Sequence, residues 1–335
     1  MSSLTDDRWG IKRETTYGTA VTVDRFYPWV EVEGSWDNRR RTAQGLQGGG
    51  GRRTVLGSRS FLPKGIGKIR TKVELDSKGL GVLFDLGLGV SVVTSITGGA
   101  HMNFHTGLST GFMPSATIQV VKVMNTGTEF VETYAGCTAS KLTIEQPNEA
   151  IPTVDIEWDA LTVVTNVAAA TPAYPANTTM FDSSQAAAFV GGAYTAPTTT
   201  ALATVATAFA DFKSFKLEIE QNLDMERWIL GNRNRPIAGV PTYTFDGEAE
   251  FNATTMADYV LNGARFPFAC TWTTTETLGA GFTQFQVSIP AMGLVGDLAK
   301  VSIGETRTLT AKGQVVNDGT NRDMYICYRT TDTAL

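Results

Sequence analysis

Few residues of this chain have the type and spacing that metal binding or catalysis needs. His101 and His105 are its two histidines, and a pair four residues apart can bind a metal from one face of a helix. Glycines on both sides break any helix here, and no glutamate stands between the two histidines. Structural zinc needs about four ligands. We therefore expect no metal site, and two histidines leave few options for a nucleophilic triad.

Glycine-rich segments offer no better candidate. The glycines at 48–51 precede Arg52 and Arg53, which resembles a phosphate-binding loop in composition only, because the Gly-Lys-Ser/Thr ending and the following helix are missing. The glycines within residues 79–89 flank an apolar helix instead of opening one in dinucleotide-binding spacing. No paired carboxylates stand out from the many scattered Asp and Glu residues. We predict no catalytic residue, no metal ligand and no cofactor, so the chain is predicted not to be an enzyme.

Charge is concentrated in one loop. Residues 37–68 hold eight basic residues against Asp37 alone, a net +7 that leaves −12 for the rest of a chain with net charge −5. Long loops in compact domains are usually functional or disordered, and a basic loop can dock onto the acidic body of a neighbouring copy. Trp36 and Phe61 beside it can anchor the loop or stack on nucleic acid, and anchoring is the commoner role. The candidate interaction residues of this basic loop are Arg39, Arg40, Arg41, Arg52, Arg53 and Arg59.

Alternating apolar and polar residues predict a chain made mostly of strands. We expect no membrane helix, since no run of 18 apolar residues occurs, and no signal peptide, since the first ten residues lack an apolar segment. Three widely spaced cysteines predict reduced, buried thiols. Turns are expected at Gly127, Gly136, 147–148 and 290–293. The strands are predicted at 30–36, 69–75, 116–123, 129–133, 140–145, 153–158, 214–221, 242–251, 266–274, 282–289, 300–303, 307–316 and 324–329.

Two segments of the chain resemble each other. Residues 65–89 and 239–263 follow the same pattern, and a shift of 176 places Leu75 on Phe251 and Gly87 on Gly263. In each, a strand and a polar loop precede an alternating return strand, a polar start signal, a short amphipathic helix and a stopping glycine. The first helix is expected at about 78–86, capped by Asp76 or Ser77, and the second after a Thr254 cap. The second loop is nearly neutral, and its candidate interaction residues are Arg227, Arg233 and Arg235.

A shorter similarity links residues 141–146 and 216–221, which share the pattern Lys-Leu-x-Ile-Glu-Gln. These segments fall at different places in the two repeats. We interpret them as two similar edge patterns and not as part of the repeat.

The predicted fold is therefore mainly β, with two tandem β-sandwich or half-barrel units that each carry one short flanking α-helix. A repeated unit without catalytic residues favours an assembly component. The alternative is a carbohydrate- or cell-binding β-sandwich module, which would be monomeric with an exposed aromatic platform. The predicted division is an N-terminal arm at 1–28, a first unit at 29–162, an excursion or linker rich in Ala, Thr, Pro and Gly at 163–210, and a second unit at 211–335.

The order of several short motifs resembles that of a known family. Residues 10–20 read GIKRETTYGTA, the strand-helix segments end at Gly87 and Gly263, and residues 134–137 read YAGC before a strand. In this order they resemble the tail tube proteins of long-tailed, siphovirus-type bacteriophages. The resemblance implies a structural virion protein of the tail, assembled in the host bacterial cytoplasm, whose stacked rings form a conduit for DNA.

The same resemblance implies partners. The chain would bind itself in a ring whose inner sheets join into a continuous barrel, with a trimeric pseudo-hexamer favoured over a hexamer because two units lie in one chain. Other implied partners are the tape measure protein and the tail terminator and tip proteins, with no membrane. Phage DNA would pass through an acidic lumen without specific binding, and the basic loop would join stacked rings.

Overall fold

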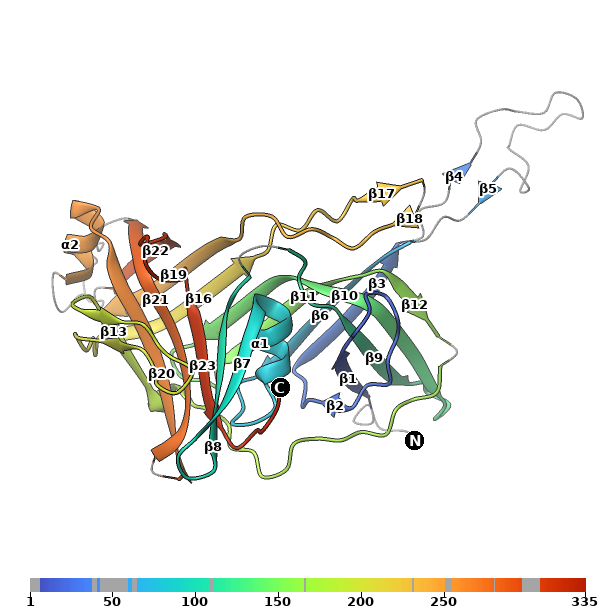
Figure 1. Ribbon diagram of the computed structural model, residues 1–335, viewed down its shortest axis with the longest axis horizontal. Helices are drawn as coiled ribbons and strands as arrows, with labels where there is room; N and C mark the ends of the chain where they lie inside the picture. The colour runs from blue at the N-terminus through green and yellow to red at the C-terminus, as the bar shows by residue number, and fades with distance from the viewer. Residues whose placement is uncertain are drawn as a thin grey trace, which may run out of the picture.

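The chain forms antiparallel β-structure with two short helices in the part that the structure describes, which confirms the mainly β fold class (Figure 1). Within that part no helix is long and apolar enough to cross a membrane. The computed structural model describes residues 7–37, 41–42, 60–61, 65–108, 111–165, 167–230, 232–250, 255–279, 281–296 and 308–335.

Eight strands pair side by side in one long row, each antiparallel to the next. Buried and exposed side chains alternate along them, because one face covers the core and the other is polar. We call the chain up to the end of β12 (Thr162–Val164) the first half, and the rest the second half. Four strands come from each half, so the two halves share one sheet. In order, the row is β3 (Glu31–Asp37), β6 (Ile66–Glu74), β11 (Thr153–Ala160), β10 (Glu129–Gln146), β16 (Phe212–Glu220), β19 (Thr242–Glu250), β22 (Thr308–Val315) and β21 (Gly281–Gly296).

The second four strands of the row repeat the first four. In each half, the strand before the long loop comes first, the return strand second, and the strand that bends into a second layer last. The ladder between β10 and β16 joins the halves, and it pairs Leu142 with Ile219 and Ile144 with Leu217. The segments 141–146 and 216–221, whose similarity the sequence shows, are therefore neighbours in the sheet.

A second layer of strands covers the buried face of the row. In the first half, β1 (Arg8–Arg13) and β12 (Thr162–Val164) flank β9 (Ala116–Val123) and the first part of β10. In the second half, β13 (Ala186–Val190), β20 (Phe266–Leu278), the first part of β21, and β23 (Tyr325–Thr330) stand in the same order. The segment 163–210 thus supplies, through β13, the counterpart of the N-terminal strand β1. The smaller elements here are β2 (Arg25–Phe26), β14 (Tyr194–Thr195), β15 (Thr204–Val205) and the 3₁₀ helix η3 (Ser183–Gln185).

One hairpin belongs to the first half alone. The strands β7 (Gly89–Ile96) and β8 (Ala100–Gly107) follow the first helix, and no strand was predicted there. β8 pairs with β23 of the second half, from Thr106 opposite Tyr325 to His101 opposite Thr330. The hairpin therefore extends the second layer of the other half. The division into two units at 29–162 and 211–335 stays a prediction, since the two halves share both the row and this hairpin.

Two predicted turns are wrong, because β10 and β21 run through them as continuous strands. Gly136 has a φ of 68° at a register shift between Tyr134 and Cys137, so it forms a bulge inside β10. An added Cβ there would lie 2.7 Å from the Cβ of Leu161. The bulge lets β10 bend from the second layer into the row, and the predicted turn at 290–293 lies inside β21.

The first helix differs from its prediction at both ends. α1 (Gly81–Leu88) starts after Leu80 with no side-chain cap, so the predicted Asp76 or Ser77 cap is wrong. It continues through Gly87 and ends at Gly89, whose φ of 97° suits glycine. All eight residues are buried, so the expected amphipathic helix is a core helix. In the second helix, α2 (Thr255–Asn262), the stop at Gly263 is confirmed by a φ of 60°, and Thr254 lies outside the described residues.

Aromatic side chains fill the space between the layers. Phe245 stacks on Phe215 with ring centroids 5.6 Å apart, and Trp272 lies 5.3 Å from Phe285. Trp272 Nε1 donates a hydrogen bond of 2.5 Å to Gln146 Oε1, which links the halves inside the core. Each pair of aromatic rings contributes about 0.5–1.5 kcal/mol to stability beyond the hydrophobic contribution of the area it buries. The predicted buried thiols are confirmed, since Cys137, Cys270 and Cys327 are all free and buried.

Two hairpin arms project from the same side of the molecule (Figure 1). The first contains β4 (Arg41–Thr42) and β5 (Ser60–Phe61), and the second contains β17 (Trp228–Ile229) and β18 (Asn232–Arg233). We call residues 222–241, between β16 and β19, the second arm.

Candidate functional site

The two ends of the strand row are the first candidate for a binding site. β3 pairs with β6 along one side, and no described strand pairs with its other side. At the far end, β21 pairs with β22 from Met292 to Gly296, and beyond Met292 no described strand joins its other side. Val295 in this segment is 67% exposed. Strand edges of this kind are ready to pair with another chain.

The internal junction shows which strand edges fit together. β10 and β16 form six residue pairs, from Lys141 opposite Glu220 to Gln146 opposite Phe215. Lys141 Nζ lies 3.1 Å from a Glu218 carboxylate oxygen and 3.7 Å from one of Glu220. Within the repeat, β21 is the counterpart of β10 and β3 is the counterpart of β16. The free ends of the row are therefore equivalent to the two strands that already pair at its centre.

The polar face of the row is the second candidate. Ion pairs cross it, including Arg70 with Asp155 at 2.6 Å and Lys216 with Glu218 at 2.7 Å. Such partly exposed pairs contribute about 0–1 kcal/mol each. Acidic residues outnumber basic ones by twelve to seven on this face, so it carries a net negative charge. The acidic residues are Glu31, Glu33, Asp37, Glu74, Glu145, Asp155, Glu157, Glu218, Glu220, Asp246, Glu248 and Glu250, and the basic ones are Lys68, Arg70, Lys72, Lys141, Lys213, Lys216 and Lys312.

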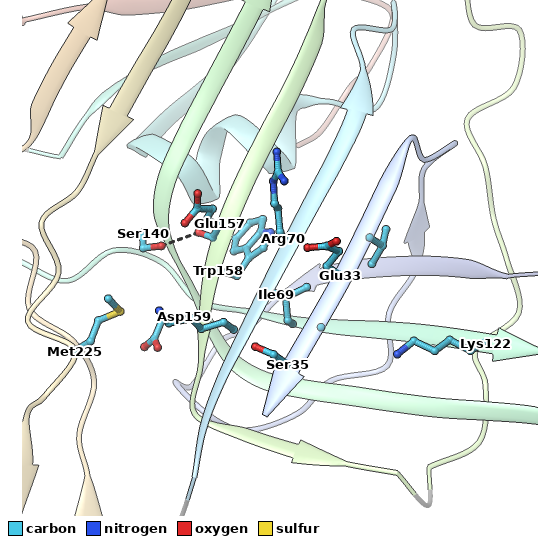
Figure 2. A pocket seen from close by; sticks show the side chains of 13 residues that line it. Glu33, Ser35, Ile69, Arg70, Lys122, Ser140, Glu157, Trp158, Asp159 and Met225 are labelled. Atoms are coloured by element: carbon cyan, nitrogen blue, oxygen red, sulfur yellow. Dashed lines mark hydrogen bonds between the residues drawn. The ribbon is translucent and has the colours of Figure 1, made fainter. Parts of the chain in front are cut away.

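A groove of about 660 Å³ lies beside β3, between the row and the second arm. Figure 2 shows Met225 of the arm on one side and Lys122 of β9 on the other, with Glu33 and Arg70 between them. The Ser140 hydroxyl donates a hydrogen bond of 3.0 Å to the Glu157 carbonyl oxygen. Charges of both signs line the groove, and no group of three metal-ligating side chains occurs there or elsewhere among the described residues.

The predicted arginines of the second loop lie together on the second arm, and they contact the first half of the chain. Arg233 forms a buried ion pair with Asp159 and donates a hydrogen bond of 2.8 Å to the Ala160 carbonyl oxygen. Burial raises the pKa of the Asp159 carboxyl, and the hydrogen bond and charge of Arg233 oppose that shift. Asp159 lies at the end of β11, 74 residues from Arg233, so the arm is held across the internal junction.

Arg235 and Arg227 hold the same arm over an aromatic surface. Arg235 Nη2 donates a hydrogen bond of 2.5 Å to the Met113 carbonyl oxygen, and its guanidinium lies 5.1 Å from the centre of the Phe112 ring. Arg227 Nη1 donates to the Arg235 carbonyl oxygen at 3.1 Å. The three arginines thus make contacts within their own chain, and their predicted role toward a partner stays a prediction.

The arginines of the first loop cannot be placed in the same way. Arg41 lies in β4, of which the structure gives the backbone pairing with β5. The remaining predicted residues, Arg39, Arg40, Arg52, Arg53 and Arg59, lie outside the described residues.

The two histidines lie on strand β8 and not on a helix. His105 is fully buried, its Nδ1 is 2.7 Å from the Ser91 hydroxyl, and burial lowers its pKa to about 3. His101 is half-buried four residues earlier on the same strand. His105 is therefore a neutral core residue at ordinary pH.

A family model described as phage tail tube protein matches residues 7–320. The chain belongs to the phage tail tube protein family. The match spans both halves of the strand row, so the joined row is the body of the tail tube protein. This membership gives the protein a structural role in the phage tail and self-association into a tube. No curated protein matches the sequence.

Sequence reasoning missed the strand edges that this tail tube protein presents at the ends of its row. Residues 141–146 and 216–221 share a pattern and pair with each other, but the similarity by itself does not show that two strands are neighbours. The pairing of β8 with β23 and the Asp159 partner of Arg233 left no comparable signal, since both contacts join residues far apart in the sequence.

Proposed function

We propose that this tail tube protein forms closed rings in which β3 of one chain pairs with the end of β21 in the next chain. The observation that carries the proposal is the β10–β16 junction, where the repeat equivalents of these two strands already pair. Joining the ends of every row removes the unpaired edges of each chain. Such a head-to-tail contact closes into a ring when its rotation returns to the start.

The register of the proposed contact follows from the repeat. Arg70 in β6 and Asp246 in β19 are equivalent, because they are separated by the repeat shift of 176. Arg70 pairs with Glu157 and Asp246 pairs with Lys312, so Lys312 is the counterpart of Glu157. Lys141 is opposite Glu157, and Val295 is opposite Lys312, so Val295 is the counterpart of Lys141. Asp37 pairs with the first residue of β6, and Glu220 pairs with the first residue of β19. Asp37 is therefore the counterpart of Glu220. Val295 of one chain is thus expected opposite Asp37 of the next.

The number of chains in the ring follows from the duplication. Each chain contributes two repeats to the row, so three chains supply six repeats and form a pseudo-sixfold ring. We favour this trimer over a ring of six chains, which would need twice as many repeats around the same lumen.

The polar face of the row would line the lumen, because the opposite face is covered by the second layer. Its acidic majority repels the phosphates of DNA, so the genome can pass without binding. Rings would stack into the tail tube that conducts the DNA, with the basic loop at 37–68 in contact with the adjacent ring. The tape measure protein and the tail terminator and tip proteins are the proposed further partners, and assembly is proposed to take place in the host cytoplasm.

Disulfide trapping tests both the contact and the number of chains. Cysteines replacing Asp37 and Val295 should link neighbouring chains on oxidation, and non-reducing electrophoresis should show a ladder that ends at three chains. The native cysteines are buried and should not interfere. The matched control combines Val295→Cys with Ser35→Cys, two residues out of register, and should link far less. A ladder that continues to six chains would contradict the trimer, and equal linking in both variants would contradict the register.

A further inference from the structure

The second arm ends in an apolar tip that no contact among the residues described by the structure explains. Leu230 is 98% exposed and Ile229 is 53% exposed, at the turn between β17 and β18. Leu230 also has a φ of 49°, a left-handed conformation that glycine or asparagine adopts more readily than leucine. A bulky apolar side chain at such a position costs conformational energy and solubility, so the tip has the character of a binding element.

The arm holds this tip in a fixed position. Its stem is tied to the first half by the buried Arg233–Asp159 pair and by the hydrogen bond from Arg235 to the Met113 carbonyl oxygen. Trp228 opposite Arg233 and Ile229 opposite Asn232 form the ladder below the tip. A tip presented on such an anchored stem loses little freedom on binding, because it is ordered in advance.

A partly apolar hollow, whose wall also includes Asp76 and Lys78, lies at the strand ends opposite the arms. It has a volume of about 190 Å³ and lies where β6 ends, at Val73 and Glu74, whereas the arms leave the row at the opposite ends of the strands. Figure 1 shows the arms on the upper side and the segment that follows β12 along the lower side. Tyr27, Pro28, Tyr174, Pro175 and Met180 form the apolar part of its wall.

We propose that Leu230 and Ile229 of one chain insert into this hollow of a second copy of the chain in the adjacent ring. The proposal rests on the proposed function, because stacked rings of one polarity bring the arm side of one ring against the hollow side of the next. The size suits one or two aliphatic side chains, and Met180, which is 48% exposed, can adapt its shape to them. The contact is head-to-tail and does not close, so it propagates along the tube.

Three variants of the full-length protein test the tip. Leu230→Asn keeps a residue that tolerates the left-handed backbone but removes the apolar side chain, and it should leave rings intact while reducing tubes at least ten-fold. Leu230→Met keeps an apolar side chain and should retain tubes. Val240→Asn is the matched control, since Val240 is 84% exposed on the same arm away from the tip, and it should also retain tubes. Ring formation is measured by mass photometry and tube formation by negative-stain electron microscopy.

The outcomes separate this contact from the proposed function. Normal tubes from Leu230→Asn would overturn the role of the tip, and so would a loss of rings in that variant, which would place the contact inside the ring. Absence of rings in the unaltered protein would overturn the proposed function itself. The hollow is tested by oxidising tubes that carry Leu230→Cys with Met180→Cys, which should link chains. Linking by Leu230→Cys with Ala187→Cys instead would move the contact to the hollow beside β13.

Discussion

The guanidinium of Arg233 and the carboxylate of Asp159 form an ion pair with both side chains at most 2% exposed. The pair joins the arm of the second half to the end of β11 in the first half. Removing one partner of a buried pair leaves the other charge without compensation and costs about 3–5 kcal/mol. It is therefore the single contact on which the placement of the second arm most depends.

We predict that Arg233→Met lowers the free energy of unfolding by about 3 kcal/mol or more, measured by urea denaturation. The double variant Arg233→Met with Asp159→Leu should recover much of this loss, because no buried charge remains. The exposed pair Lys12–Asp24, at 2.6 Å, is the control, and Lys12→Met should cost about 1 kcal/mol or less. Equal losses at the two sites would show that Arg233 does not hold the arm.

Acid should destabilise the protein through His105. Its pKa is lowered from the usual 6.5 to about 3 by burial, so the unfolded chain binds a proton more readily than the folded chain between these values. Stability is therefore lost as pH falls below about 6.5, by about 2 kcal/mol at pH 5 from this group alone.

The variant His105→Asn retains a polar side chain that can hydrogen-bond the Ser91 hydroxyl, and it does not titrate. The difference in unfolding free energy between the native protein and this variant should shrink steadily from pH 7 to pH 5. A difference that stays constant over this range would contradict the assignment of a neutral, buried His105.

Charge at Val295 should tune the contact between chains. Val295 is the counterpart of Lys141, which lies near the carboxylates of Glu218 and Glu220 at the internal junction. Val295→Lys should strengthen the ring by up to about 1 kcal/mol through Asp37 of the neighbouring chain, and Val295→Glu should weaken it by a similar amount. Dissociation of rings on dilution measures both effects, and identical behaviour of the two variants would argue against this neighbour.

The polar face of the row should decide whether DNA passes freely. Replacing Asp246 and Glu248 by lysine reverses two charges on β19, and tubes of this variant should bind DNA with an affinity that falls as salt rises. Asp258→Lys, at an exposed position on α2 and not on the polar face of the row, is the control and should not bind. If the control binds DNA as well as the β19 variant, the polar face does not line the lumen.

Local patterns in the sequence were sufficient for much of the fold. β9 has the predicted bounds, and β3 and β6 lie close to theirs, because alternation of apolar and polar residues is itself the consequence of having one buried face. The prediction failed where glycine has two possible roles. Gly136 was assigned to a turn, yet it forms a bulge inside β10, because only the partner strand decides between the two.

The candidate site was less predictable, since it depends on which strands pair. The alternation of side chains along a strand does not show which strand pairs with it. The pairing of residues 141–146 with 216–221 could therefore not be predicted from their pattern alone. Arg233 illustrates the same limit. An arginine in a polar loop is usually exposed, and its burial follows from Asp159, which lies 74 residues away in the chain.

Cryo-electron microscopy of assembled tubes tests the central claim most directly, since it gives both the number of chains in a ring and the strand next to β3. The predicted result is three chains in each ring, with β3 of one chain paired to the end of β21 in the next and the polar face toward the lumen. Six chains in a ring, or a β3 edge that pairs with any other strand, would contradict the account.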